Sequence, residues 1–242
     1  GFQSIKSGNS KIIIAGGQEN MSLAPHAIHL RDGKKLGDTE IIDTMIKDGL
    51  WDAFNGYHMG VTAENVAEKF QITRDEQDKF ALKSQEKALK AQKQNKFNDE
   101  IIDFKITSRK AEVNFNVDEH PREGINLDAL SRLKPAFKKD GTVTAGNASG
   151  INDGAAAVTL MSEEEAVKRG IKKLVSIKSW ASCGVDPALM GTGPIPSSKK
   201  ALELAGWDIG DVDLFEINEA FAAQSLAVIK TLSVPEEKVN VN

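Results

Sequence analysis

The sequence predicts an α/β protein whose regular order is interrupted by an inserted α+β segment. From about Leu174 onward, strand and helix patterns alternate, which favours a βαβ unit with a parallel sheet. Residues 21–142 do not follow that order and are predicted to be the insertion. The β-branched apolar run at residues 11–15, which leads into Gly16 and Gly17, suits a strand that is buried on both faces.

Composition places the chain among globular proteins and excludes several functions. Of its 242 residues, 40% are hydrophobic and 27% are charged, so a disordered or fibrous chain is excluded. Apolar runs are short and the net charge is -4, so we expect neither a membrane span nor a nucleic-acid partner. The single cysteine, Cys183, excludes an intrachain disulfide and a cysteine-based zinc site, and we expect a cytoplasmic protein.

Local patterns predict the elements of the first two thirds of the chain. Helical spacing of apolar residues predicts the end of a helix in residues 1–10. Thr73 and Glu76 have the spacing of a capping box, which begins a helix. Two runs of alternating apolar and polar residues, 102–106 and 113–117, predict an antiparallel hairpin with one polar face.

The last third is predicted to alternate between helices and strands. Ser162 begins a short helix, and Ser197 or Ser198 begins a longer one. The apolar runs at residues 174–180 and 212–217 are predicted strands, and the second leads directly into a helix at Asn218.

Glycine-rich and polar segments carry the candidate chemistry. They lie at residues 15–22, 56–60, 144–154 and 217–221. Glycine lets a backbone approach a ligand closely, and a polar residue between a strand and a helix places donors toward an anion or a developing oxyanion. Asn218 occupies such a position.

Each candidate residue also has a purely structural interpretation. Asn218 suits a helix N-cap, His58 suits a packed core histidine, and Ser149 suits an ordinary loop. Gly16 and Gly17 fit neither a Walker A loop nor a dinucleotide-binding fingerprint.

Taken together and in this order, the segments resemble the thiolase family, most closely its short-chain biosynthetic class. The similarity runs through essentially the whole chain, and although each segment alone is weak, their order is specific. The segments that carry it are APHAIHLR (24–31), GYHMGVTAENVA (56–67), RDEQD (74–78), GVDP (184–187), MGTGPIP (190–196) and NEAFAAQ (218–224).

The resemblance implies a layered αβαβα fold, incomplete in this chain, with an inserted α+β loop domain. Residues 26–43 resemble the loop through which these enzymes assemble, so a homo-oligomer, a tetramer or a dimer, is expected. The implied domains are a remnant of the N-terminal half (1–20), the loop domain (21–142), the last part of the N-terminal half (143–172) and an incomplete C-terminal half (173–242).

The resemblance also implies a reaction. Two acetyl-CoA molecules condense reversibly to acetoacetyl-CoA and CoA: one cysteine is acylated, a second removes a proton from the incoming acetyl group, and oxyanion holes stabilise the charge. The CoA thioester is the substrate, and no further cofactor or metal is expected.

The resemblance assigns roles to individual residues. Asn218 matches the asparagine that holds a water in an oxyanion hole. His58 and Met59 match residues of the pantetheine tunnel and acyl pocket, where Met59 favours short acyl groups. The other implied CoA-binding residues are Ala145, Ser149, Met190 and Phe221 at the pantetheine, and Arg122 and Phe137 at the nucleotide end.

The sequence leaves three alternatives to a catalytically active acetyl-CoA-condensing enzyme. We expect the nucleophilic cysteine of the family before residue 1, and its catalytic histidine and second cysteine after residue 242. Cys183 matches a position that is not catalytic in the family. We therefore expect no turnover by these 242 residues. The chain is then a non-catalytic protein that binds CoA through Ser149, His58 and Arg122, or one that joins the oligomers of an intact relative. Within enzymes, the alternative is a degradative 3-ketoacyl-CoA thiolase.

Overall fold

The computed structural model describes residues 1–107 and 111–242, and the chain divides into two units. Unit 1 comprises Gly1–Leu50 and Ile151–Trp180, and unit 2 comprises Trp51–Gly150 and Ala181–Asn242. Within these described ranges, no helix has both the length and the apolar character that a bilayer span requires.

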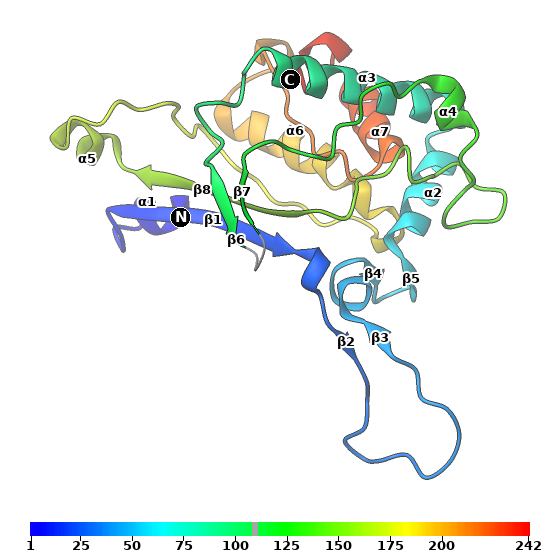
Figure 1. Ribbon diagram of the computed structural model, residues 1–242. Helices are drawn as coiled ribbons and strands as arrows, with labels where there is room; N and C mark the ends of the chain where they lie inside the picture. Colours follow the sequence, from blue (N-terminus) through cyan, green and yellow to red (C-terminus); the bar gives the residue numbers. More distant parts are fainter. Residues whose placement is uncertain (108–110) are drawn as a thin grey trace. The chain divides into compact units, whose positions relative to one another are not determined.

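Unit 1 is built on one long antiparallel pair of strands, β1 (Ile12–Asn20) and β8 (Asp153–Met161), drawn in blue and yellow-green in Figure 1. Two short helices, α1 (Phe2–Lys6) and α5 (Glu163–Lys168), accompany the pair. α1 confirms the helix predicted within residues 1–10. α5 begins as predicted, because the Ser162 hydroxyl accepts a hydrogen bond from the N–H of Glu165.

The prediction of a strand at residues 11–15 is confirmed, but its burial on both faces is wrong. The side chain of Ile13 is half-buried beside Gly1 at the start of α1, whereas Ile14, on the opposite face, is 77% exposed. The pairing with β8 is antiparallel. A β-branched run fits a strand covered on one face as well as one covered on two, so composition alone does not determine the covering.

The remaining short elements of unit 1 flank a long loop. β2 (His26–Ala27) and β3 (Ile42–Asp43) pair antiparallel and close it at its base. Leu36 in this loop is 92% exposed. A 3-10 turn, η1 (Met21–Leu23), precedes β2, and a single wide helical turn, η2 (Met45–Gly49), follows β3.

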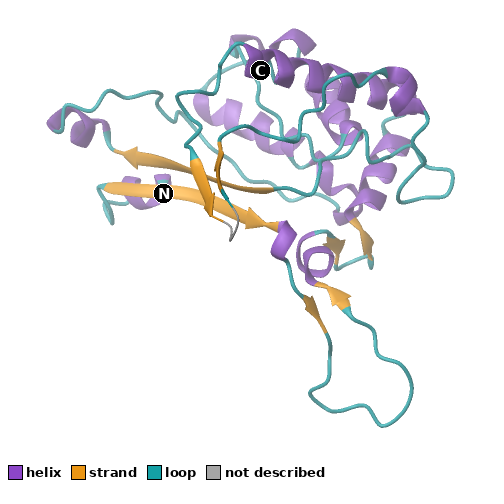
Figure 2. Ribbon diagram, viewed as in Figure 1, coloured by secondary structure: helices purple, strands orange, loops and turns teal. Residues whose placement is uncertain are grey.

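Unit 2 is dominated by helices, as Figure 2 shows in purple. The central helix is α7 (Ala222–Leu232), in which every residue from Ala222 to Ile229 is buried. The side chain of Phe80 contributes to both apolar clusters that surround α7. The other helices and short strands are α2 (Met59–Lys69), α3 (Arg74–Lys93), α4 (Leu127–Ser131), α6 (Pro194–Ala205), β4 (Trp51–Asp52), β5 (Tyr57–His58) and the turns η3 (Pro187–Thr192), η4 (Ile209–Asp211) and η5 (Glu236–Lys238).

The predicted hairpin is confirmed as β6 (Phe104–Thr107) paired antiparallel with β7 (Glu112–Phe115). Phe104 lies opposite Phe115 on the apolar face. That face is not covered, since Phe104 is 66% exposed, so the expectation of a single solvated face is wrong. The predicted turn at 108–110 lies outside the described residues.

Two predicted strands of the last third, and with them the predicted parallel pairing, are wrong. Residues 174–180 form no strand, and Leu174 is 92% exposed. Residues 212–217 form no strand either, and their one pairing is an isolated parallel bridge between Phe215 and Val239. An apolar run becomes a strand only where a partner offers a ladder, and that partner is not encoded in the run itself.

Two predicted helix starts are also shifted. The helix placed at Asn218 begins at Ala222, and the helix placed at Ser197 or Ser198 begins at Pro194. Proline is well suited to a first helical position because its φ is already helical and the N–H it lacks would be unpaired there. The end of α6 at Gly206 has the left-handed conformation (φ 70°) that glycine adopts at low cost.

The predicted capping box of α3 is confirmed and extended. The Thr73 hydroxyl accepts from the N–H of Glu76, and the Thr73 N–H donates to the Glu76 carboxylate at 2.7 Å. The other carboxylate oxygen of Glu76 accepts from Lys230 at 2.7 Å, which ties α3 to α7. The hydrogen bond from Lys230, followed by those from Thr73, lowers the pKa of Glu76 to about 2.

We predict that Glu76→Gln destabilises the fold at pH 7 but not at low pH. A carboxyl whose pKa is lowered in the folded state stabilises it above the ordinary pKa of 4.5, and that contribution is lost as the pH falls toward 2. Because the Glu76 side chain is 37% exposed, screening limits the expected loss to about 0.5–1 kcal/mol. Urea unfolding between pH 3 and 7 measures it. The control is Glu203→Gln in the exposed pair with Lys200, and an equal loss in both variants would contradict the prediction.

Candidate functional site

An aromatic cluster brings together three of the predicted site residues. The rings of His58 and Phe137 are stacked, with centroids 4.7 Å apart and planes 18° from parallel. The ring of Phe221 meets Phe137 edge-on, at 6.2 Å and 86°. These rings come from β5, from the segment between α4 and β8, and from the start of α7, so the fold collects them from three distant parts of the sequence.

His58 has a defined protonation state in this cluster. Its Nδ1 accepts a hydrogen bond from the N–H of Gly60 at 3.0 Å, which makes His58 the N-cap of α2. Nδ1 is then the unprotonated nitrogen, and Nε2 carries the hydrogen. Burial lowers the pKa of His58 below its ordinary 6.5, so the imidazole is neutral at pH 7. His58 is half-buried rather than enclosed, so its interpretation as a core histidine is wrong.

Gly60 is required for the stack. A Cβ atom at this position would lie 2.2 Å from the ring of Phe137, which is far inside van der Waals contact. The ring of Phe137 therefore packs directly on the backbone of the first turn of α2 while its face covers His58.

The segment at residues 141–150 is held against the start of α7 by main-chain hydrogen bonds. Ala148 and Phe221 form an antiparallel bridge. The Ser149 N–H donates to the carbonyl of Ala220 at 3.0 Å, and the Ala222 N–H donates to the carbonyl of Asn147 at 2.9 Å. The side chain of Ser149 remains exposed, as does that of Ala145, so both are accessible to a ligand.

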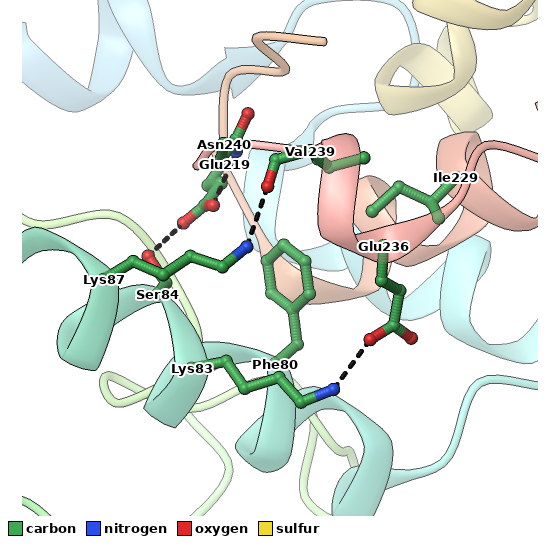
Figure 3. Close-up of a pocket in the computed structure, with 9 residues that line it drawn as sticks. All are labelled: Phe80, Lys83, Ser84, Lys87, Glu219, Ile229, Glu236, Val239 and Asn240. Atoms are coloured by element: carbon green, nitrogen blue, oxygen red, sulfur yellow. Dashed lines mark hydrogen bonds and ion pairs between the residues drawn. The ribbon is translucent and has the colours of Figure 1, made fainter. Parts of the chain in front are cut away.

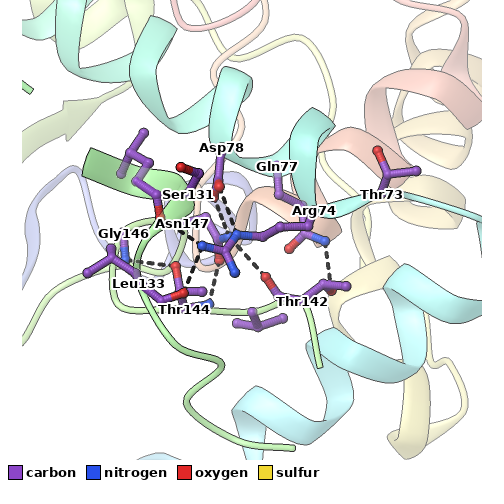
Figure 4. A network of polar contacts seen from close by, with 12 residues as sticks. Thr73, Arg74, Gln77, Asp78, Ser131, Leu133, Thr142, Thr144, Gly146 and Asn147 are labelled. Atoms are coloured by element: carbon purple, nitrogen blue, oxygen red, sulfur yellow. Dashed lines mark hydrogen bonds and ion pairs between the residues drawn. The ribbon is translucent and has the colours of Figure 1, made fainter. Parts of the chain in front are cut away.

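A buried polar network under this segment fixes its course, as Figure 4 shows. Asn147 is 3% exposed and uses its whole amide: Nδ2 donates to Asp78 at 2.9 Å and to the carbonyl of Thr142 at 3.1 Å, and Oδ1 accepts from the N–H of Thr144 at 2.8 Å. The second oxygen of Asp78 accepts from Arg74 at 2.7 Å. The side-chain nitrogen and oxygen atoms of Asn147 and both carboxylate oxygens of Asp78 therefore have partners.

A second buried carboxylate anchors the beginning of the segment. Glu64, in α2, accepts from the N–H groups of Thr142 and Val143 at 2.9 and 2.8 Å. The Thr142 hydroxyl donates to Glu64 and in turn accepts from Gln77. Glu64 and Asn147 are not among the residues predicted from the sequence to form the site, although they lie inside the segments 56–67 and 144–154.

Asn218 is exposed and has no helical role. α7 begins at Ala222 with Phe221 as its N-cap, so the alternative interpretation of Asn218 as a helix cap is wrong. Its main-chain carbonyl accepts from the side chain of Gln224 at 3.2 Å. A free amide on a fixed main chain is an arrangement that can donate to a negatively charged oxygen.

Two methionines predicted to contact the ligand lie in α2 and in η3, which packs against α2. Met59 is the half-buried first residue of α2, and Met190, in η3, is 48% exposed. The amide of Asn65 in α2 donates to the Tyr57 hydroxyl and to the carbonyl of Ala188, which holds η3 against α2.

Arg122 and Phe137, which the resemblance places at the nucleotide end of CoA, have different contacts in the structure. Arg122 is exposed, and its main-chain N–H donates to the Gln85 side chain, whereas Phe137 stacks on His58.

Cys183 is half-buried in a segment without regular secondary structure, and its thiol forms no disulfide. Among the described residues, no cluster of three or more His, Cys, Asp or Glu side chains is arranged to hold a metal ion.

Comparison with known families identifies the family of this chain. The family model "Thiolase, N-terminal domain" matches residues 1–164, and "Thiolase, C-terminal domain" matches residues 171–242. The chain therefore belongs to the thiolase family, and the predicted α/β fold of the thiolase type is confirmed.

Similar curated proteins are named acetyl-CoA acetyltransferase. The Rhizobium meliloti and Shinella zoogloeoides proteins are each 61% identical over 242 residues, covering 100% of this chain and 62% of the relative. The rat protein, named cytosolic, is 54% identical over 99% of this chain and 61% of its own length. The chain thus spans about 62% of the length of these two bacterial relatives.

Solved structures of thiolase-family proteins have the same fold as this chain. The Bacillus anthracis acetyl-CoA acetyltransferase has a TM-score of 0.95 and 49% identity, covering 98% of this chain and 60% of that one. The human mitochondrial 3-ketoacyl-CoA thiolase also has a TM-score of 0.95, with 42% identity, covering 99% of this chain and 61% of that one.

We predict that Gly60→Ala separates the rings of His58 and Phe137. The added methyl group would occupy the position of the Phe137 ring, which must then move away from the imidazole. Renewed hydration should raise the pKa of His58 toward 6.5, which NMR titration of the imidazole protons measures. In the control, Gly210→Ala, the added Cβ meets no atom within 4 Å. An unchanged pKa in a folded Gly60→Ala protein would refute the role given to Gly60.

We predict that Asn147→Ala costs about 2–4 kcal/mol of stability, because it leaves buried groups on Asp78 and Thr144 without a partner. Chemical denaturation measures the loss. The matched control is Asn116→Ala, which removes a similar amide–carboxylate hydrogen bond to Asp103 on the exposed hairpin and should cost less than about 0.5 kcal/mol. Similar losses of stability for the two variants would show that the buried network stabilises the fold no more than an exposed hydrogen bond does.

Proposed function

We propose that this chain forms the CoA-thioester-binding part of an acetyl-CoA C-acetyltransferase. The proposed reaction joins two acetyl-CoA molecules into acetoacetyl-CoA and CoA, and runs in reverse as thiolysis. The observation that carries the proposal is the cluster of His58, Phe137 and Phe221, which assembles three residues that the resemblance assigns to CoA binding. Relatives with 61% identity and that name support the same reaction.

The residues of the cluster suit the pantetheine arm of CoA. That arm combines apolar methylene groups with amides, so it can pack on the aromatic side chains and exchange hydrogen bonds with polar groups beside them. The neutral imidazole of His58 offers Nε2–H as a donor, and the exposed Ser149 hydroxyl can donate or accept. Met190, half exposed, adds a flexible apolar surface.

We assign charge stabilisation to Asn218. During condensation, the methyl group of acetyl-CoA gives a proton to a base, and its thioester carbonyl gains negative charge. The resulting carbanion attacks the acyl carbon of the thioester formed with a thiol, so that a C–C bond forms, the acyl C–S bond breaks and the thiolate leaves and takes up a proton. The Asn218 amide, acting through a water, donates toward that oxygen. Removing one such donor typically costs about 10²–10³-fold in rate. The acylated thiol and the base are proposed to be groups other than Cys183, the only cysteine among these 242 residues.

The alternative reaction is the thiolysis of longer 3-ketoacyl-CoA substrates. The human mitochondrial 3-ketoacyl-CoA thiolase has the same TM-score, 0.95, as the Bacillus anthracis acetyl-CoA acetyltransferase, so the fold is compatible with either reaction. Met59, at the first turn of α2, argues for short acyl groups, because its bulk would reduce the space for a chain.

The proposal also covers the cofactor requirement, the oligomeric state and the cellular location of the enzyme. We propose that the CoA thioester is a substrate and that no further cofactor takes part. The exposed loop between β2 and β3 is proposed to join copies of the protein into a homo-oligomer, a dimer or a tetramer. A cytoplasmic location is proposed on the basis of the rat relative named cytosolic.

We predict that the 242-residue chain binds CoA but does not turn over acetoacetyl-CoA. Isothermal titration calorimetry should show binding that Phe221→Ala weakens about 3–10-fold, as expected for loss of one aromatic contact. The control is Phe54→Ala, which removes a phenylalanine that is 85% exposed and outside the cluster.

Two results would contradict this proposal. If Phe221→Ala and Phe54→Ala weaken CoA binding equally, the aromatic cluster is not part of the binding site. Thiolysis that is abolished by Cys183→Ser would show that Cys183 is the nucleophile and that the assignment of the chemistry to other groups is wrong.

A further inference from the structure

The main chain around Asn218 is fixed although it belongs to no helix or strand. An irregular segment normally has to be ordered when a ligand binds, and that ordering costs conformational entropy. Here the hydrogen-bonding groups on both sides of Asn218 already have partners supplied by side chains from other segments.

On one side, the side chain of Asn240 fixes Ile217 and Glu219. Its Oδ1 accepts from the Ile217 N–H at 2.7 Å, and its Nδ2 donates to the Ile217 carbonyl at 2.8 Å and to the Glu219 carboxylate at 2.6 Å. Figure 3 shows Glu219 between Asn240 and Ser84, whose hydroxyl donates to the other carboxylate oxygen at 2.6 Å. The residues before and after Asn218 are therefore held.

On the other side, Gln224 holds the carbonyl of Asn218 itself. Gln224 is 4% exposed and lies in the first turn of α7. Its Oε1 accepts from the Phe221 N–H at 3.3 Å, and its Nε2 donates to the Asn218 carbonyl at 3.2 Å. One amide thus links the start of the helix to the residue proposed to stabilise charge.

Packing leaves Gln224 little freedom to adopt another rotamer. A Cβ atom at Gly191 would lie 2.7 Å from Cγ and 2.9 Å from Cβ of Gln224, so the backbone of η3 lies directly on this side chain. The side chain of Gln224 is therefore confined between η3 and the segment that carries Asn218.

From this geometry we infer that Gln224 is a positioning residue for Asn218, an inference that rests on the proposed function of Asn218. The amide of Gln224 holds the peptide plane that follows Asn218 and thereby sets the direction of the Asn218 side chain. A misplacement of about 1 Å at such a donor can cost about 10²-fold in rate. Glutamine is needed because the site requires both an acceptor for Phe221 and a donor for Asn218, and glutamate supplies only the acceptor.

The variant Gln224→Glu separates helix capping from positioning. Glutamate at this position of the first turn keeps the acceptor for the Phe221 N–H and is favourable near a helix N-terminus. It loses the donor to the Asn218 carbonyl and places a negative charge beside it. Gln224→Met, which loses both hydrogen bonds at similar length, is the second variant if the buried charge prevents folding.

The matched control is Gln92→Glu. Gln92 also donates its side-chain amide to a main-chain carbonyl, that of Asp118 at 3.1 Å, but this hydrogen bond is exposed to solvent. The same chemical change is therefore made with no link to Asn218.

The first readout is the enolate content of bound acetoacetyl-CoA, followed by near-ultraviolet absorbance. A donor aimed at the enolate oxygen raises the ratio of enolate to keto form. We expect Asn218→Ala and Gln224→Glu each to lower that ratio about tenfold, since a hydrogen bond to a charged oxygen has this order of effect. Gln224→Glu should have no further effect in the Asn218→Ala protein, because it acts through that residue.

The outcomes separate the two proposals. If Asn218→Ala lowers the ratio but Gln224→Glu does not, or if the two effects add independently, the positioning role is overturned while the function of Asn218 stands. If Asn218→Ala leaves the ratio unchanged, the proposed function of Asn218 fails.

A second readout decides the positioning role without any ligand. NMR order parameters of the N–H groups of Asn218 and Glu219 should fall from about 0.85 toward 0.6 in Gln224→Glu and remain unchanged in Gln92→Glu. Unchanged values in a folded Gln224→Glu or Gln224→Met protein would overturn the inference whatever the result with acetoacetyl-CoA.

Discussion

The hydrogen bond from the buried amide of Asn147 to the carboxylate of Asp78 is the interaction on which the candidate site depends. It lies inside unit 2, where an unpaired amide or carboxylate would be costly, so the segment that carries Asn147 has one strongly favoured course. The carbonyl of the same residue receives the first N–H of α7, from Ala222. The network thereby connects α3, the segment at residues 141–150 and the start of the central helix.

This connection explains how exposed site residues are kept in place. Ser149 and Asn218 have side chains open to solvent, but their main chains are held from beneath by buried groups and by the side chains of neighbouring segments. The side chains that can contact a ligand therefore lie on irregular segments, and contacts with the helices fix the positions of those segments. Binding sites in general often have this arrangement. The aromatic cluster adds a rigid apolar surface beside them.

Sequence reasoning succeeded where the physical cause was local. The capping box of Thr73 and Glu76 involves residues three positions apart, so the start of α3 could be predicted. It failed where the cause was distant: residues 174–180 have strand composition without a strand partner, and Asn147 meets Asp78 across 69 positions of sequence. Asn218, His58 and Ser149 could be singled out from their local sequence, but Phe137 and Phe221 came only from a resemblance, because no spacing rule connects them to His58 before the chain folds.

The imidazole of His58 caps a helix and faces the candidate site at the same time. Its Nδ1 can accept from Gly60 only while that nitrogen has no proton. Acidification below the pKa of His58 would convert Nδ1 into a donor, so the first turn of α2 would lose its cap just as the imidazole gained a positive charge. Ligand recognition and the local stability of α2 therefore both depend on Nδ1 of His58 remaining unprotonated, and burial, which lowers the pKa of His58, protects both.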